Sequence, residues 1–236
     1  MNTLLKLNAV WIVSVVWVLT AAPLQAAAPS VIYANSTNDL VTRFNPGTTE
    51  VGDQIKLAGT ERMLTAFSFE FWGTNTAMPD NSSFSSTIQA RVRFYENDGP
   101  LFSGYASPGT MFFDSGWFNV DKPTSRSTFL FAAGSDFPSW GEFIPADEMT
   151  WSVQFAGMGL TDSVGLDLYS PPTVGQNYDD YWSYNGGGWA LQTNSVATMS
   201  FGAYMEAVVP EPSVVTLSTI GGLSLLMLTR RLRGKA

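Results

Sequence analysis

The sequence predicts an all-β body, a two-sheet antiparallel sandwich that is either jelly-roll-like or immunoglobulin-like. Apolar residues recur at every second position in several segments, which is typical of strands with one buried face. Groups of Asn, Asp, Gly and Pro separate these segments and favour turns. No window of ten or more residues between the two ends of the chain shows a helical apolar stripe. About nine or ten short strands with one solvated face each need a second sheet to cover the other face.

The alternation is clearest in five segments. In 65–72, Phe67, Phe69 and Phe71 point to one side, while Glu70 and Trp72 point to the other. The other four strands are expected at 88–95, 150–155, 164–168 and 199–207. Their expected inward residues are Ile88, Ala90, Val92, Phe94, Trp151, Val153, Phe155, Val164, Leu166, Leu168, Met199, Phe201, Ala203, Met205 and Ala207. Weaker patterns predict strands near 54–57, 111–113, 117–120, 127–131 and 189–191.

The N-terminal segment predicts a secretory signal peptide over 1–28. Lys6 is the sole charge before an apolar run over 10–19, and Ala26 and Ala28 lie in the small-residue stretch that follows. A basic start, a short apolar core and a small-residue exit are what signal peptidase requires. The alternative is a retained anchor, but the apolar run is short for a membrane span.

The last segment, 209–236, combines a proline-rich linker, an apolar run and a basic end. The run over 214–229 has no charge and is somewhat shorter than the ~20 residues of a typical spanning helix. Snorkelling arginines extend its reach, and their position favours a cytoplasmic C-terminus. The linker prolines forbid a helix and keep that stretch extended and exposed. The residues of this pattern are Pro210, Glu211, Pro212, Arg230, Arg231 and Arg233.

This order of elements closely resembles the PEP-CTERM sorting signal of exported proteins in Gram-negative bacteria that produce exopolysaccharide. The resemblance implies recognition by an exosortase, a transient intermediate in the inner membrane, and delivery to the cell surface or extracellular matrix. The alternative is an ordinary C-terminal anchor behind a proline-containing linker.

The composition of the remaining body, 29–208, excludes several function classes. The body holds seven basic and 19 acidic residues, a net charge of about −12. We therefore expect no nucleic-acid partner, because nothing replaces phosphate counterions. The chain has no cysteine and no histidine. This excludes disulfide staples, Ser-His-Asp triads, Cys-His pairs and the usual zinc sites.

Carboxylates are the remaining acid–base groups. The candidates are Asp147 with Glu148, Asp179 with Asp180, and Glu142. Adjacent acids on a strand point to opposite faces, so these doublets make poor catalytic pairs. We expect no catalytic residues and no enzyme, and a secreted glycoside hydrolase remains a remote alternative.

Two acidic turns are weak candidates for calcium. Asp98 lies in an Asn-Asp-Gly turn, and Asp179 and Asp180 follow Asn177. Turns that present oxygen atoms suit a hard cation, but neither segment has the spacing of an EF-hand loop. Asx residues also stabilise turns without any metal. No other cofactor is expected.

Large rings are concentrated in 177–189, with Tyr181, Trp182, Tyr184 and Trp189 as candidate glycan-binding residues. A sugar site needs an apolar plate with polar groups at its rim. The alternative is that these rings belong to the core and to strand edges. The sequence thus leads to an exported, non-catalytic surface protein associated with exopolysaccharide. The second hypothesis is a carbohydrate-binding module.

Overall fold

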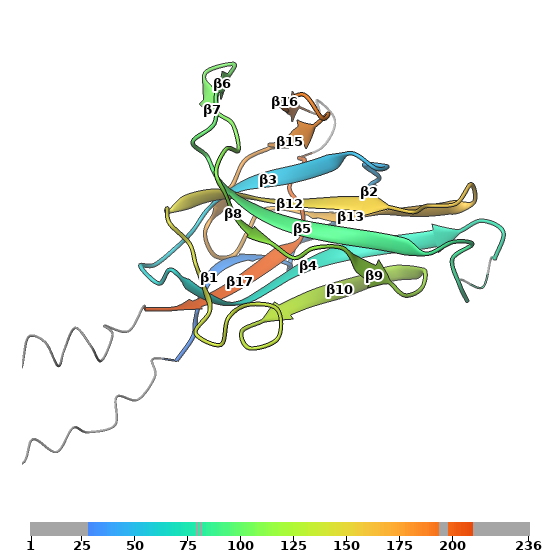
Figure 1. Cartoon of the computed structure of the whole chain (residues 1–236), viewed down its shortest axis with the longest axis horizontal. Helices are drawn as coiled ribbons and strands as arrows, with labels where there is room; N and C mark the ends of the chain where they lie inside the picture. Colours follow the sequence, from blue (N-terminus) through green and yellow to red (C-terminus); the bar gives the residue numbers. More distant parts are fainter. Residues whose placement is uncertain (1–27, 79, 81, 194–197, 210–236) are drawn as a thin grey trace, which may run out of the picture.

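The computed structural model describes residues 28–209, except positions 79, 81 and 194–197. Within these residues all regular structure is β, arranged as two large antiparallel sheets and one small hairpin, β6–β7 (Figure 1). The all-β, two-sheet prediction is confirmed.

Sheet A has seven strands in the order β1-β17-β4-β13-β2, and β10 and β11 also pair with β4. Its strands are β1 (Ser30–Asn35), β2 (Asp39–Phe44), β4 (Met63–Asn75), β10 (Thr124–Ala132), β11 (Glu142–Phe143), β13 (Asp162–Tyr169) and β17 (Ala203–Val208). The long strand β4 is the centre of this sheet because β10, β11, β13 and β17 all pair with it.

Sheet B has eight strands in the order β16-β15-β3-β12-β5-β8, with β14 on β3 and β9 on β5. Its strands are β3 (Glu50–Lys56), β5 (Ile88–Glu96), β8 (Met111–Asp114), β9 (Phe118–Val120), β12 (Glu148–Ala156), β14 (Gln176–Asn177), β15 (Asp180–Tyr184) and β16 (Trp189–Thr193). The separate hairpin consists of β6 (Leu101–Phe102) and β7 (Tyr105–Ala106) and projects from the body beside β15 and β16 (Figure 1).

One aromatic core joins the two sheets. Phe67 of sheet A meets Phe94 and Trp151 of sheet B, with ring centroids 5.0 and 5.4 Å apart in edge-to-face contacts. Such contacts add about 0.5–1.5 kcal/mol each beyond the burial of apolar area. The core therefore depends on apolar packing, as the absence of cysteine requires.

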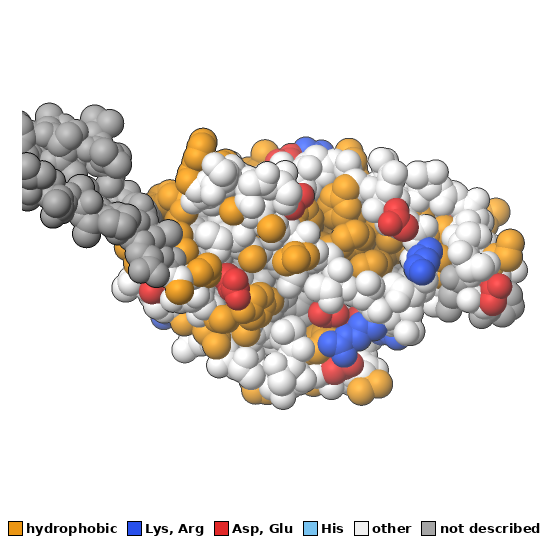
Figure 2. All heavy atoms as spheres, turned by 90° about the horizontal axis from the view of Figure 1, so that it is seen from below, with side chains coloured by type: hydrophobic (Ala, Val, Ile, Leu, Met, Phe, Trp, Pro, Cys, Tyr) orange, Lys and Arg blue, Asp and Glu red, His pale blue; other side chains and the backbone are white. Residues whose placement is uncertain are grey.

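Charged side chains are sparse on the face of the molecule in Figure 2, where they form a few small groups among hydrophobic and uncharged side chains.

The predicted inward faces are confirmed. All five clear segments overlap an observed strand or, at 199–202, lead into one, and their predicted inward residues are buried. The expectation of one solvated face per strand is wrong for β4 and β13. Glu70 and Trp72 of β4, and Asp167 and Tyr169 of β13, are buried on the face away from the core. Strands β1, β2 and β15 were not predicted, because their alternating patterns are weak.

The predicted signal peptide and sorting tail lie outside the described residues, except for their innermost positions. The expected apolar span over 214–229 is entirely outside them. Within the described part of the chain, no helix has the length and apolar character needed to cross a membrane.

Candidate functional site

Of the aromatic residues predicted to bind sugar, Tyr181, Trp182 and Tyr184 lie on β15, and Trp189 lies on β16. Successive side chains of a strand point to opposite sides, so Tyr181 and Trp182 diverge. Tyr181 turns inward, where its ring lies 5.0 Å from the ring of Phe44 and 6.0 Å from that of Phe201. Trp182 turns to the outer face of sheet B. The expectation that Tyr181 and Trp182 belong to one exposed plate is therefore wrong.

Trp182 is also unavailable for stacking, because its side chain is 0% exposed. Phe102 of the projecting hairpin contacts its ring edge-to-face, with centroids 6.3 Å apart. The indole Nε1 donates a hydrogen bond to Oε1 of Gln54 at 3.0 Å. The hairpin thus covers a residue that the sequence suggested as an exposed sugar contact, and the prediction for Trp182 is corrected.

Tyr184 and Trp189 do lie together on the outer face of sheet B. Their ring centroids are 5.3 Å apart, and Trp189 is also 5.3 Å from Tyr95. Tyr184 is exposed and Trp189 is half-buried. Their part in glycan binding stays a prediction.

A hollow of about 240 Å³ opens between the projecting hairpin and the β14–β15 segment, and neither Tyr184 nor Trp189 lines it. Its lining residues come from five strands and the loop between β14 and β15: Gln54, Tyr105, Glu148, Tyr178, Asp179, Asp180 and Leu191. Tyr105 is 55% exposed and Tyr178 is 39% exposed, so two phenol rings are available at its rim. We call this hollow the hairpin pocket.

A chain of hydrogen bonds fixes the polar groups of the hairpin pocket. Trp182 donates to Gln54, and Nε2 of Gln54 donates to Oε1 of Glu148 at 2.8 Å. The hydroxyl of Tyr178 donates to the same Oε1. Within the described part of the chain, no group donates to Oε2 of Glu148. Buried Trp182 therefore positions a carboxylate whose second oxygen is available for a ligand.

The hairpin pocket is acidic. Glu148, Asp179 and Asp180 line it, and its other lining residues carry no positive charge. The hydrogen bond to Glu148, together with burial, raises the pKa of Tyr178 to about 12. Burial, helped by the charge of Asp179, raises the pKa of Asp180. The site suits neutral or cationic ligands and repels anions.

The predicted acidic doublets behave differently from one another. Asp147 points to Arg62, at 2.6 Å from Nη2, while its neighbour Glu148 lines the hairpin pocket. Both members of the Asp179–Asp180 doublet line it. Glu142 lies in sheet A, where burial raises its pKa.

The calcium candidates do not form a multi-carboxylate site. Both oxygens of Asp98 accept hydrogen bonds from Thr110, at 2.6 Å each. These bonds lower the pKa of Asp98 and tie two loop segments together. Across the described residues, no three carboxylates are gathered in a way that could hold a metal ion.

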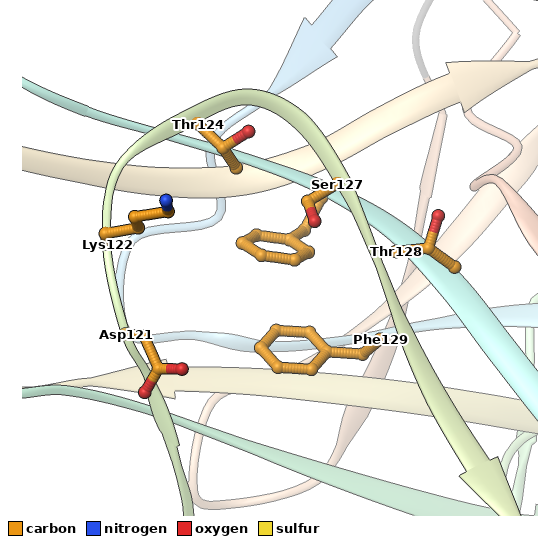
Figure 3. Close-up of a pocket in the computed structure, with 7 residues that line it drawn as sticks. Asp121, Lys122, Thr124, Ser127, Thr128 and Phe129 are labelled. Atoms are coloured by element: carbon orange, nitrogen blue, oxygen red, sulfur yellow. The ribbon is translucent and has the colours of Figure 1, made fainter.

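A second hollow, of about 280 Å³, lies under the connection between β9 and β10 (Figure 3). Asp121 and Lys122 stand on the loop that arches around it, and the ring of Phe129 points into its centre. Phe129 stacks on Phe71 with centroids 4.4 Å apart. Phe71 is 5% exposed, and Phe129 also contacts Phe69 and Phe118, so both rings belong to the edge of the core.

Comparison with known proteins found no match to a family model, to a curated protein or to a solved structure. Sequence reasoning missed Gln54 and Tyr105 as site residues. Tyr105 follows Gly104, whose positive φ of 90° marks a tight turn, but nothing in the sequence shows that this hairpin lies against β15 and β16.

Proposed function

We propose that this chain is an exported, tail-processed surface or matrix protein of a Gram-negative bacterium, and that its sandwich binds a neutral or cationic glycan without catalysis. The observation that carries the binding proposal is the hairpin pocket. Two exposed tyrosine rings line it together with a carboxylate that a hydrogen-bond chain from the buried Trp182 holds in place.

The hairpin pocket has the parts that sugar recognition needs. Phenol rings supply apolar area for a pyranose face, and Glu148, Asp179 and Asp180 supply acceptors for hydroxyl groups. Burying about 100 Å² of ring surface contributes roughly 2–3 kcal/mol at about 25 cal/mol per Å². After the costs of association, single sites bind weakly, and many copies on a surface are needed for retention.

A hydrolase is the less favoured reading of the same pocket. A glycosidase needs one carboxyl group that gives up a proton and a second at a fixed separation. Oε1 of Glu148 is occupied as the acceptor of hydrogen bonds from Gln54 and Tyr178, and the nearby Asp179 and Asp180 are adjacent on the chain, a poor arrangement for a catalytic pair. Reducing-end assays with polysaccharides should therefore show no product above a Glu148→Gln control.

The binding proposal is tested with the full chain in a detergent that carries no sugar. Tyr105→Ala and Tyr178→Ala should each weaken binding on a glycan array while the melting temperature changes little. Trp140→Ala is the matched control, because Trp140 is 71% exposed and is not a lining residue. Equal glycan binding by all three variants and the wild type would remove the pocket as the site.

The sorting proposal rests on the sequence pattern and the family resemblance. Replacing Pro210, Glu211 and Pro212 by alanines should leave the full-length form in the membrane and deplete the surface form. Processing that continues unchanged would show that the triplet is a linker. Mass spectrometry of the surface form should also give a mature N-terminus at 27–29, where small residues fit signal peptidase.

A further inference from the structure

A third hollow lies on the outer face of sheet A and is separate from the hairpin pocket. It measures about 380 Å³ and is lined by Asp39, Val41, Arg43, Arg126 and Asp167. We call it the sheet A hollow. No sequence motif pointed to it, because its residues come from strands β2, β10 and β13.

A bulge in the edge strand β2 shapes this hollow. Arg43 pairs with Asp167, while Asp39 pairs with Tyr169, so β2 has two more residues than β13 over this stretch. Val41 lies in the bulge with a φ of 55°, which is costly for a β-branched residue. Its side chain is almost fully exposed at the rim.

Two aromatic rings lie under the arginines of the hollow. The guanidinium of Arg43 is 5.6 Å from the ring centre of Trp72, and that of Arg126 is 5.0 Å from the ring centre of Tyr169. Glycines lie close to both rings: a Cβ at Gly202 would lie 2.6 Å from the Tyr169 ring, and a Cβ at Gly165 would clash with the Phe44 carbonyl at 2.0 Å and lie 3.0 Å from Nε1 of Trp72. Since the arginines already cover these rings, the hollow recognises polar groups rather than a flat sugar face.

The charges of the cluster do not balance. Arg126 pairs with Glu70 at 3.2 Å and with Asp39 at 3.4 Å, and Arg43 is left with Asp167 at 3.5 Å. Three carboxylates therefore face two guanidinium groups. Asp167 is 5% exposed, and its Oδ2 has no hydrogen-bond partner among the described residues. Asp167 thus lines the hollow with a carboxylate that has no hydrogen-bond donor on its enclosed oxygen and only a long ion pair on the other, which leaves its charge incompletely compensated.

We infer that the sheet A hollow binds a primary ammonium group that is flanked by hydroxyl groups, as in an amino-sugar unit, with the ammonium on the carboxylate of Asp167. A monovalent cation supplies the charge and the donor that the cluster lacks. A metal ion does not fit, because the described carboxylates form no metal-holding group. An anion is disfavoured, because each guanidinium already has a carboxylate partner.

The hydroxyl requirement follows from the arginines. Within the described part of the chain, no acceptor takes a hydrogen bond from Nη1 of Arg43 or from Nη2 of Arg126. Sugar hydroxyl oxygens accept such bonds and add no charge. A simple alkylamine offers the ammonium but no acceptor, so it should bind more weakly than an amino sugar.

The electrostatics of Asp167 give the inference a pH signature. Burial raises its pKa to about 6; Arg43 on β2 and Arg126 on β10 oppose this, and Asp39 on β2 and Glu70 on β4 reinforce it. An ammonium ligand needs the ionised carboxylate. Its affinity should therefore rise by about tenfold between pH 5 and pH 7 as Asp167 loses its proton.

The test uses ligand-observed NMR on the full chain in a sugar-free detergent, with glucosamine, N-acetylglucosamine and butylamine as probes. Glucosamine should bind best, and acetylation, which removes the charge, should weaken binding by about tenfold or more. Asp167→Asn should remove both the binding and its rise with pH. Equal binding of glucosamine and N-acetylglucosamine would overturn the ammonium requirement.

Two further variants keep the inference separate from the hairpin pocket. Asp39→Asn removes one negative charge from the hollow at a more exposed position and should weaken glucosamine binding. It serves as the test if Asp167→Asn does not fold. Glu148→Gln changes the hairpin pocket and should leave the Asp167-dependent binding intact. Loss of glucosamine binding in Glu148→Gln but not in the two sheet A variants would overturn the inference. Asp147→Asn, an exposed carboxylate elsewhere, is the charge control.

Discussion

The two outer faces of the sandwich both bury charge, but they partner it differently. On sheet B, Glu50 accepts hydrogen bonds from Arg93, from the hydroxyl of Tyr95 at 3.0 Å and from Ser152 at 2.6 Å. On sheet A, Asp167 has one long ion pair and an oxygen without a partner among the described residues. A fully partnered carboxylate holds strands together, whereas an incompletely partnered one at a hollow is available for a ligand.

The tryptophans repeat the contrast. Nε1 of Trp182, on sheet B, has an acceptor in Gln54, while Nε1 of Trp72, on sheet A, has none among the described residues. The hydroxyl of Tyr169, also on sheet A, is likewise unpartnered there. Burial alone therefore does not separate structural groups from binding groups on these two faces, whereas the hydrogen-bond partners distinguish them.

The largest expected effect would come from removing Glu50. Glu50→Ala leaves Arg93, Tyr95 and Ser152 without their shared acceptor and should lower the free energy of unfolding by about 3–5 kcal/mol. Urea unfolding followed by circular dichroism measures it. Glu206→Ala, a half-buried carboxylate with one tyrosine partner, should cost about 1 kcal/mol or less. Similar losses in the two variants would contradict the structural role of the Glu50 network.

Asp53 also has a carboxylate oxygen without a partner among the described residues, but it lines none of the three hollows described above. Its effect should therefore be on stability alone. It is fully enclosed in the core, with Oδ2 accepting from the amide of Phe201 at 2.9 Å and Oδ1 without a described partner. Burial raises its pKa well above the usual range. The folded state then binds this proton more tightly than the unfolded state, so wild-type stability falls as pH rises above about 4.

Asp53→Asn should remove that pH dependence. The stability difference between the wild type and this variant should change by up to about 1.4 kcal/mol per pH unit as pH rises from 4, and it should level off above the folded pKa. Urea unfolding at several pH values measures it. A difference that stays constant with pH would show that Asp53 is ionised in the folded protein.

The two tryptophans allow a matched comparison of partnered and unpartnered donors. Trp182→Phe and Trp72→Phe remove the same volume, but only the first leaves an acceptor, Oε1 of Gln54, without its donor. Trp182→Phe should therefore cost about 1–3 kcal/mol more than Trp72→Phe. Thermal melting of both variants checks the order, and the reverse order would remove the proposed difference between the faces.

The smallest effect is expected at Asp167, and it has the opposite sign. Its raised pKa of about 6 means that wild-type stability falls as pH rises from about 4 to 6. The full loss is about 3 kcal/mol. Asp167→Asn avoids it but gives up the ion pair with Arg43, so a net gain of about 1 kcal/mol should make it melt roughly 2–4 °C above the wild type at pH 8. A lower melting temperature at pH 8 would make Asp167 a structural residue like Glu50.

Local residue patterns were enough to predict the fold class and the inward faces of the strongest strands. Phe67, Phe69 and Phe71, for example, face the core as predicted. Alternation is a local property, since each side chain's face depends on its own strand. The acidic, histidine-free and cysteine-free composition likewise depends on no contact. The edge strands β1 and β2 were not predicted, because their alternating patterns are short and weak.

Contacts between distant strands determine which outward positions are buried and which polar groups converge. Trp182 is covered because the distant β6–β7 hairpin lies against it, and Asp167 meets Arg43 and Arg126 because β13 pairs with β2 and β4 pairs with β10. These pairings join segments tens of residues apart. No local pattern of alternating residues encodes them, so the two proposed binding hollows became visible only in the folded chain.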